Sequence, residues 1–312
     1  MEWNSQRAGR HLKLRDLHVL MTVARCGSMG KAAAQLAVSQ PAISKAIADM
    51  EHTLGVRLLD RSALGVEPTI YASALLDHGM IAFDELQQAI RKIEHLADPT
   101  AGHVRIGCSV VLGEGFVAGV INRLSQRYPR MTFYLSAEES GMTYRALEER
   151  KVDVAILPIF EPVPQAHLTI EILYDEPHVI AAGVRNPWSS RRKIRLADLM
   201  HEPWALPPPE SLTGSLVREA FQAAGLAVPN ATIVTPSTPA RHALVASGPF
   251  LTILPASVLA SASDKTAPKA LPIELATGRR PIGIITLKNR ALSPAAQQFI
   301  DCARDVTRPS TK

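Results

Sequence analysis

The sequence predicts three parts: a small all-α domain that holds a helix-turn-helix, a long connecting helix, and a larger α/β domain. Three observations lead to this prediction. The sign of the charge changes twice along the chain, apolar residues recur at helical spacing up to residue 96, and short apolar runs alternate with helical stretches beyond it. The length of 312 residues also exceeds what one hydrophobic core usually supports, so several domains are expected.

The charge distribution places the domain boundaries. Residues 1–66 contain nine Lys or Arg and five Asp or Glu, residues 67–98 contain two and six, and residues 99–312 contain 23 and 18. A basic head, an acidic connector and a weakly basic body result. The segment 97–102 combines Asp, Pro, Thr and Gly, which are residues that end helices and form turns. We therefore place the boundaries after residues 66 and 98.

The overall composition is that of a globular protein, with 46% hydrophobic and 20% charged residues. Cys26, Cys108 and Cys302 are few and widely spaced, which argues against a disulfide framework or a zinc site and favours a reducing compartment. No stretch has the pattern of an export signal or of a membrane span. We expect a cytoplasmic protein that has no membrane partner.

A helix-turn-helix is predicted between residues 28 and 54. Ser28 and Ser39 are each placed to cap a helix, and Pro41 fits the first turn of the second one. The apolar residues of this second helix fall on one face and are Ile43, Ile47, Met50 and Leu54. In such a motif the second helix enters the major groove of DNA with its N-terminal residues at the base edges.

The opposite face of that helix carries side chains that suit base recognition. Gln pairs with adenine, Lys reaches guanine acceptors, and Ser bonds to bases or phosphates. The candidate contacts there are Ser39, Gln40, Pro41, Ser44 and Lys45. Lys31, near the helix N-terminus at Ser28, is placed for a phosphate. An ordinary pair of packed helices with a solvated polar face would show the same pattern.

The connector between residues 68 and 96 carries two apolar series with a period of seven residues, three positions apart, as in helices that pair with one another. Their members are Leu76, Phe83, Leu86, Ile90 and Ile93. A helix of about 28 residues spans about 42 Å. We expect a homodimer through this seam; the alternative is a helix that packs on the body of its own chain.

Alternation of strands and helices fills the rest of the chain, which predicts an α/β body with one or two mostly parallel sheets. Expected strands are 104–108, 132–136, 152–158, 179–182, 232–234, 251–254 and 282–287. Expected helices are 116–128, 144–149, 216–224, 241–246 and 294–304.

A ligand site is expected beyond the carboxyl ends of these strands. Ser109 and Pro158 each follow or end one strand, and Thr235 and Ser237 follow another. Hydroxyls and backbone N–H groups there could bind a carboxylate, a phosphate or a sugar. The same residues could equally serve as helix caps, and Pro158 could simply shape the wall.

Enzyme motifs are weak. Gly113, Gly115 and Gly119 have the spacing GxGxxxG rather than that of a dinucleotide site, and the SxxK pattern at Ser28 and Lys31 lacks its β-lactamase companions. GxSxG, HExxH and the P-loop are absent, and the histidines are scattered. We expect no enzymatic activity, no metal and no cofactor. The alternative, a small-molecule-binding protein or enzyme with an accessory helical head, would lack salt-sensitive, sequence-selective DNA binding.

Residues 14–69 resemble the N-terminal domain of LysR-type transcriptional regulators. The likeness is carried by Leu17, Ala24, Gly27, Ser28, Ala32, Ala33, Leu36, Val38, Ser39, Gln40, Pro41, Ala42, Ile43, Ser44, Lys45, Ile47, Glu51, the segment 54–59 and Arg61. The length, the connector and the α/β body agree as well, so the resemblance spans nearly the whole chain.

The resemblance implies a winged helix-turn-helix with the wing near residues 60–66, a dimerising linker helix, and an effector domain similar to periplasmic binding proteins, with two α/β subdomains. It implies a sequence-specific DNA-binding regulator that a small molecule in the cleft controls. By motif position it makes Gln40, Pro41, Ser44 and Lys45 groove contacts and Arg61 a wing contact. Two dimers often form a tetramer on double-stranded DNA, and RNA polymerase is a further candidate partner.

Some positions depart from the family pattern. Leu59 stands where the family usually has Phe, and Gly30 where Thr is common, which loses one phosphate contact. Pro68 stands where Leu is common, so the linker helix should start later, with Thr69 as its cap. The segments 48–51 and 65–69 resemble a subgroup that regulates sugar-binding-protein genes, of the galactose-binding-protein regulator type. This points to a sugar or sugar acid as effector.

Overall fold

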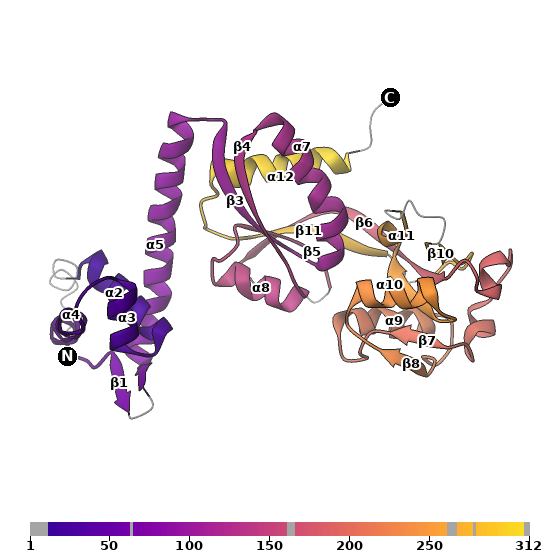
Figure 1. Ribbon diagram of the computed structural model, residues 1–312, viewed down its shortest axis with the longest axis horizontal. Helices are drawn as coiled ribbons and strands as arrows, with labels where there is room; N and C mark the ends of the chain where they lie inside the picture. Colours follow the sequence, from indigo (N-terminus) through magenta and orange to yellow (C-terminus); the bar gives the residue numbers. More distant parts are fainter. Residues whose placement is uncertain (1–11, 63–64, 161–165, 261–266, 277–278, 309–312) are drawn as a thin grey trace. The chain divides into compact units, whose positions relative to one another are not determined.

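The computed structural model describes residues 12–62, 65–160, 166–260, 267–276 and 279–308 (Figure 1). The chain divides into two compact units, residues 1–90 and residues 91–312. The predicted functional boundaries at residues 66 and 98 fall within the first unit and near the start of the second.

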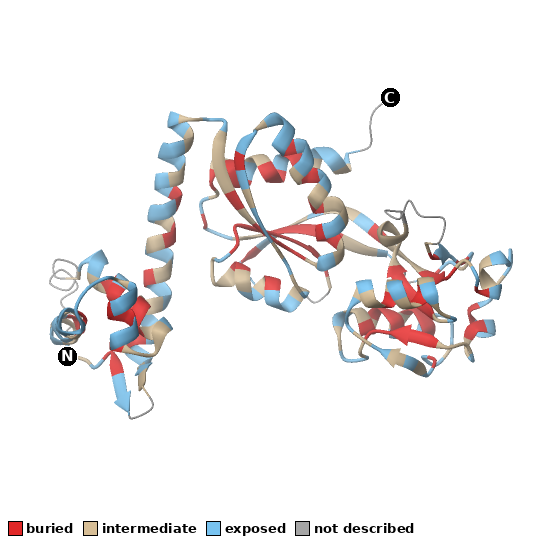
Figure 2. Ribbon diagram, in the orientation of Figure 1, coloured by how far each residue is buried: buried red, intermediate tan, exposed pale blue. Residues whose placement is uncertain are grey.

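The first unit is a helix-turn-helix followed by a two-stranded wing. Helices α2 (Leu14–Cys26), α3 (Met29–Gln35) and α4 (Gln40–Leu54) precede the antiparallel pair β1 (Leu59–Ser62) and β2 (Gly65–Pro68), and α5 (Ile70–Ala97) begins directly afterwards. Each of the three helices turns its apolar face into one core, whose fully buried members include Leu20, Val23, Ala32, Ile43, Ile47 and Leu58 (Figure 2). The predicted winged head is confirmed.

Local capping explains where these helices begin and end. The Ser28 hydroxyl accepts the N–H of Lys31 at 3.4 Å, and the Ser39 hydroxyl accepts the N–H of Ala42 at 3.4 Å. Gly27 ends α2 in the left-handed conformation with φ of +61°. The two serines therefore determine where α3 and α4 begin, independently of any ligand.

The wing is fixed to the head by hydrogen bonds that backbone N–H groups donate to the Glu51 carboxylate and to the Gly27 carbonyl. Glu51 accepts the N–H groups of Leu58 and Leu59 at 2.7 and 3.3 Å, which holds the base of β1. Gly65 has φ of +136°, and a Cβ there would lie 2.7 Å from the carbonyl oxygen of Gly27. Only glycine allows this approach, because any side chain would push the hairpin away from the turn between α2 and α3.

Helix α5 starts after Pro68, as predicted. The Thr69 hydroxyl accepts the N–H of Ala72 at 3.2 Å and donates to the carbonyl of Arg57 at 2.8 Å. Gly79 packs against Leu17, since a Cβ there would lie 2.9 Å from that side chain. The first half of the linker helix is therefore part of the head.

The predicted seam residues of α5 lie in two different environments within one chain. Leu76 packs against the core of the head, and the Phe83 ring lies 5.6 Å from the ring of His18. Leu86, Ile90 and Ile93 are 43%, 55% and 66% exposed. The physical reason is that the small head uses nearby apolar residues of α5 to complete its own core.

The second unit is built around one long mixed sheet. Its described strands are β3 (Ala101–Cys108), β4 (Arg130–Ala137), β5 (Val154–Pro158), β6 (Leu168–Ala182), β7 (Trp204–Leu206), β8 (Ala231–Val234), β9 (Leu251–Pro255), β10 (Lys269–Ala270) and β11 (Arg279–Leu287). They follow the order β4-β3-β5-β11-β6-β9-β7-β8, and β10 pairs with β6. The helices are α6 (Val110–Leu112), α7 (Ala118–Arg127), α8 (Ser140–Glu148), α9 (Leu212–Ala223), α10 (Thr238–Ser247), α11 (Ala256–Ala260) and α12 (Pro294–Thr307), with a π-helical segment at Gly113–Val117 and 3₁₀ turns at Pro187–Ser190 and Leu196–Leu199.

The expectation of a mostly parallel sheet was only partly right. Strands β3, β4 and β5 are parallel, as are β7, β8 and β9, but β11 runs antiparallel to β5 and β6, and β6 runs antiparallel to β9. The chain enters the second half of the unit through β6 and returns through β11, so these two strands must run in opposite directions. The predicted strand 179–182 is only the end of β6.

Each half of the unit has its own core, which gives the two α/β subdomains that the resemblance implies (Figure 2). The first half (β3, β4, β5, α7 and α12) buries Val104, Ile106 and Phe299. The second half (β7, β8, β9 and α9) buries Trp204 and Phe221, whose rings lie 5.6 Å apart at 79°.

A buried charge cluster holds the first half together. Asp153, 1% exposed, accepts bonds from Arg105 at 2.6 Å, Arg290 at 2.9 Å and Arg91 at 3.2 Å. Burial would raise the pKa of Asp153, but the hydrogen bonds and charges of Arg105 and the charge of Arg290 outweigh it and hold that pKa below its ordinary value. Arg91 lies near the end of α5, so this cluster also ties the last turns of that helix to the sheet.

Candidate nucleic-acid interface and ligand cleft

The polar face of α4 is free of the core. Gln40, Pro41 and Lys45 are exposed and Ser44 is half-buried, whereas Ile43 and Ile47 on the other face are fully buried. Helical periodicity thus produces the arrangement that the sequence predicted: a row of short polar and small side chains at the N-terminal end of the second helix. Such a row can approach the floor of a major groove closely.

Gln40 lies beside Gly30 at the start of this face. A Cβ on Gly30 would lie 3.5 Å from Oε1 of Gln40. This is an ordinary van der Waals distance, so the position would also accommodate the Cβ of the threonine in the family pattern. The departure noted in the sequence therefore removes a hydroxyl beside a predicted base contact.

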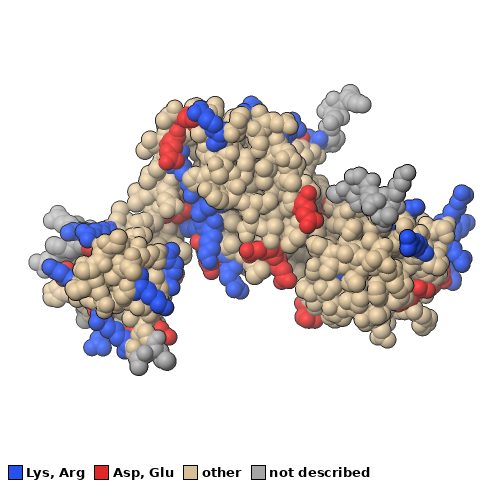
Figure 3. All heavy atoms as spheres, in the orientation of Figure 1, with Lys and Arg blue, Asp and Glu red and all other residues tan. Residues whose placement is uncertain are grey.

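The head is surrounded by exposed cations without carboxylate partners. The Lys and Arg side chains described in residues 12–90 are Lys13, Arg15, Arg25, Lys31, Lys45, Arg57 and Arg61. All of them are exposed, and none of these seven forms an ion pair in the described part of the chain. Figure 3 shows Lys and Arg atoms at several places on the visible face of the head. A phosphate backbone is the partner that such a surface suits, because each contact releases a condensed counterion.

The predicted cation contacts lie on three elements of this surface: Lys31 on α3, Lys45 on α4 and Arg61 on β1. Sequence reasoning missed Arg57, which lies exposed between α4 and the wing. Its signal was available, because a basic residue directly before a wing is placed like the predicted Arg61. Ser28 and Ser39 are brought to the same surface, but their hydroxyls already accept backbone N–H groups.

A cavity of about 620 Å³ lies in the second unit, where the two halves meet. Segments that follow the parallel strands line it: Ser109 after β3, residues 138–141 after β4, Pro158 at the end of β5, residues 210–213 after β7, residues 236–239 after β8, and Ser257 after β9. The cavity therefore opens at the carboxyl ends of the strands, where the sequence placed a ligand.

The predicted cleft residues are only partly brought together. Ser109, Pro158 and Ser237 line the cavity, and Thr235 does not. The Thr235 hydroxyl instead accepts the N–H of Ser237 at 3.3 Å and so shapes the turn before α10. Ser237 also caps α10 through the N–H of Ala240 at 3.2 Å, whereas Ser109 makes no capping bond to α6.

The lining of this cavity is acidic. Glu138, Glu139, Glu176 and Glu210 contribute carboxylates, and no Lys or Arg is present among the described residues of the lining. Glu176 is buried and accepts the N–H of Ser257 at 3.0 Å. Burial and this nearby carboxylate raise the pKa of Tyr174. Figure 3 shows acidic atoms on both sides of the junction between the halves.

A second feature that the sequence did not reveal is Arg241, in the first turn of α10. Its side chain is fully buried behind the cavity wall. Its Nη1 donates to the carbonyl of Thr235 at 3.1 Å and its Nη2 to the hydroxyl of Thr238 at 3.0 Å. Burial lowers the pKa of Arg241 to about 10, so it stays charged at neutral pH.

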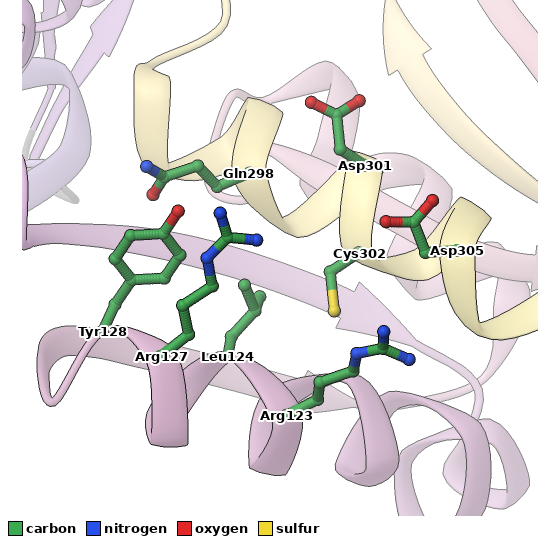
Figure 4. A pocket seen from close by; sticks show the side chains of 8 residues that line it. All are labelled: Arg123, Leu124, Arg127, Tyr128, Gln298, Asp301, Cys302 and Asp305. Atoms are coloured by element: carbon green, nitrogen blue, oxygen red, sulfur yellow. The ribbon is translucent and has the colours of Figure 1, made fainter.

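A smaller cavity of about 230 Å³ lies between α7 and α12 (Figure 4). Arg123 and Arg127 project into it from α7, and Asp301 and Asp305 from α12, so its charges are balanced. Burial raises the pKa of Cys302 at its base. Burial also raises the pKa of Cys108 to about 11, so both thiols are protonated at neutral pH and poorly nucleophilic.

Neither a metal-binding cluster nor a helix able to cross a membrane is found among the described residues. No group of three or more His, Cys, Asp or Glu side chains in them is arranged to hold a metal ion. No helix in the same ranges is both long and apolar enough to cross a bilayer.

Comparison with known families gives two matches that together cover most of the chain. Residues 14–72 match the bacterial regulatory helix-turn-helix protein of the lysR family, and residues 97–308 match the LysR substrate binding domain. The two matches correspond to the head with its wing and to the sheet with its cavity.

Curated proteins and solved structures agree with this. The chain is 30% identical to the transcriptional dual regulator GltC of Bacillus subtilis, over 93% of this chain and 96% of that protein. It is 28% identical to the HTH-type transcriptional regulator GbpR of Azospirillum brasilense, over 94% and 86%. CbnR, a LysR family transcriptional regulator, has the same fold, with a TM-score of 0.66 at 22% identity over 96% of this chain and all of that one. CbnR complexed with its target DNA gives a TM-score of 0.57 at 23% identity, over 95% of this chain and 100% of that chain.

Proposed function

This chain belongs to the LysR family of DNA-binding transcriptional regulators with an effector-binding domain, and we propose that α4 is the element that reads its operator. The observation that carries this proposal is the exposed polar face of α4, surrounded by cations that form no ion pair with any carboxylate of the described residues. A solvated helix pair would need no such excess of unpaired positive charge.

The proposed contacts fall into two groups. Gln40, Pro41, Ser44 and Lys45 face the base edges, because they lie at the N-terminal end of the recognition helix. Ser28, Lys31, Ser39, Arg57 and Arg61 surround that face and contact the phosphate backbone. The first group sets sequence preference, and the second sets affinity and orientation.

The exposed part of α5 supports a homodimer. Leu86, Ile90 and Ile93 are the seam residues that the head leaves uncovered, and a second copy of α5 would bury them. Leu76 and Phe83 then stabilise the start of the helix from within one chain. Two dimers on one operator would make a tetramer. In functional terms we propose a DNA-binding domain at 1–66, a dimerisation linker at 67–98 and an effector domain at 99–312.

The effector site is the 620 Å³ cavity. Support comes from its position at the strand ends, from its size, which suits a small metabolite, and from hydroxyls such as those of Ser109 and Ser237 in its wall. Because the cavity lies where the two halves meet, a ligand that touches both would bias their relative position and hence the geometry of the bound DNA. A sugar acid fits poorly, since its carboxylate would meet an acidic wall.

Family membership also supports the wider assignment. Regulators of this family act on chromosomal DNA, so we place the protein in the cytoplasm, assign it no catalytic reaction, and regard RNA polymerase as a partner at the promoter.

The experiment that tests the proposal is a titration of the full chain against genomic DNA fragments, followed by single-base variants of the selected site. Replacing Gln40 or Ser44 with Ala should relax the preference at one base pair by about 1–3 kcal/mol. The matched control is Ser247→Ala, an exposed serine at the end of α10 in the effector domain. An unchanged base preference in both α4 variants would contradict the assignment of α4.

A further inference from the structure

Arg241 lies directly behind the wall of the cleft. It is 0% exposed and sits in the first turn of α10, and its guanidinium bonds to the Thr235 carbonyl and the Thr238 hydroxyl. Thr238 itself lines the cavity, as does the whole segment 236–239. The positive charge is therefore separated from the cavity only by the start of α10.

This charge has no counter-charge in the described part of the chain. Both hydrogen-bond acceptors are neutral, no carboxylate pairs with Arg241, and its Nε has no partner. The position of Arg241 near the N-terminus of α10 makes its uncompensated charge more unfavourable, because the positive end of the helix dipole lies there. Arg290 shows the contrast: it is equally buried, but it bonds to Asp153 at 2.9 Å. A buried guanidinium is normally paired in this way, so the α10 terminus lacks an anion.

The exposed wall of the cavity, in contrast, carries negative charges that lack cationic partners in the lining. Glu138 and Glu139 follow β4 in the first half, and Glu210 precedes α9 in the second half. No Lys or Arg among the described lining residues neutralises these carboxylates. They attract a cation and repel a simple anion, whichever half a ligand meets first.

A small molecule with one negative and one positive group would compensate both the charge of Arg241 and the carboxylates of the cavity wall. Resting on the proposed role of the cavity as effector site, we propose that the effector is a zwitterion of amino-acid type. Its acid group lies at the N-terminus of α10, in the field of Arg241, and its ammonium group faces Glu138, Glu139 or Glu210. An amine leaves the Arg241 charge uncompensated, and a simple acid meets three carboxylates without a cation of its own.

Thermal unfolding and calorimetric titration of the full chain test the charge requirement. The probes are the twenty standard amino acids, their Nα-acetyl derivatives, which lose the α-ammonium group, and their primary α-amides, which lose the α-carboxylate. Galactose and galacturonate serve as neutral and acidic comparisons. We expect at least one amino acid to raise Tm and to bind at least tenfold more tightly than both of its derivatives. Equal binding of a derivative, preference for either sugar, or no response to any amino acid overturns the proposal.

Variants of Arg241 separate a ligand role from a structural one. If Arg241 serves the ligand, Arg241→Gln removes an unpaired buried charge, so Tm without ligand should hold or rise while amino-acid affinity falls at least tenfold. Arg241→Lys should recover part of that affinity. The matched control is Arg218→Gln, an exposed arginine on α9 that bonds to the Pro209 carbonyl. A fall in Tm without ligand in both Arg241 variants, or unchanged affinity in Arg241→Gln, assigns Arg241 to structure and overturns the inference.

DNA binding of the same preparations keeps the two proposals apart. Selective operator binding without an amino-acid response overturns this inference alone. Failure of the wild-type chain to select any DNA sequence overturns the proposed function itself.

Discussion

The two units of the molecule treat their positive charges differently. In the head, the seven described Lys and Arg side chains are exposed, and none of them forms an ion pair. In the second unit, Arg91, Arg105 and Arg290 converge on the buried Asp153, and Arg304 pairs with Glu171 at 2.7 Å. Of the two buried arginines among the described residues, Arg290 pairs with Asp153, whereas Arg241 is buried without a carboxylate.

The difference teaches which charges serve the fold and which serve a partner. A cation that holds a domain together has a counter-charge within the chain, because burial without one is costly. A cation meant for a ligand must stay unpaired until that ligand arrives. By this criterion the exposed cations of the head are available to bind a polyanion. Arg241 at the α10 terminus is available to interact with the acid group of a ligand. The same argument applies to the exposed apolar residues Leu86, Ile90 and Ile93 of α5, which a second copy of the chain would cover.

The largest effect is expected at the paired cluster. Asp153→Ala leaves Arg290 and Arg105 without their counter-charge inside the first half of the unit, which should lower the free energy of unfolding by about 3–5 kcal/mol. Urea unfolding of the full chain measures this. Asp198→Ala, which removes an exposed partner of Arg195, is the control and should change the midpoint little. An equal loss of unfolding free energy in both variants would contradict the comparison, because the buried Asp153 pairs would then stabilise the fold no more than the exposed Asp198–Arg195 pair.

The second-largest effect is expected on α5, where two substitutions should change the mass of the assembly. Ile90→Asp combined with Ile93→Asp should give monomers, since two exposed apolar contacts of the seam become charged. Folding should be unaffected, because neither side chain packs against the head. Sedimentation measures the assembly state, and Lys92→Asp on the same helix is the matched control. An unchanged mass in the double variant would contradict a dimer through α5.

The smallest effect concerns one unpaired cation of the head. Lys31→Ala should weaken binding to all DNA sequences alike and reduce the slope of log affinity against log salt by about one unit. Lys193→Ala removes an equally exposed charge from the effector domain and should leave the slope unchanged. A salt titration by fluorescence anisotropy compares them. Should Lys193 matter as much as Lys31, the unpaired charges of the head would not be a specific DNA surface.

Local features of the head could be predicted because their causes lie within a few residues. Ser28 and Ser39 cap the helices they precede, and Thr69 caps α5 after Pro68. The apolar stripe of α4 follows from helical spacing alone, since Ile43, Ile47 and Met50 must share one face. The same spacing places Gln40, Ser44 and Lys45 on the opposite, polar face.

Long strands with mixed surroundings were harder to predict. Strand β6 spans Leu168–Ala182, but only its last residues are uniformly buried. Glu171, Asp175 and Glu176 interrupt the apolar pattern of its first part, so that part does not form an apolar run in the sequence. Its antiparallel direction follows from the path of the chain between the two halves and is not written in any short segment.

The sequence by itself determined the family, the helix-turn-helix with its caps, and the identity of the side chains on the face of α4, because periodicity and turn chemistry act over short distances. Only the tertiary structure decided that Leu76 and Phe83 belong to the head, that the cleft is acidic, and that Arg241 lies unpaired behind it. These properties arise when strand ends and helix starts far apart in sequence meet, so the charge of the site is a sum over segments that no local pattern connects.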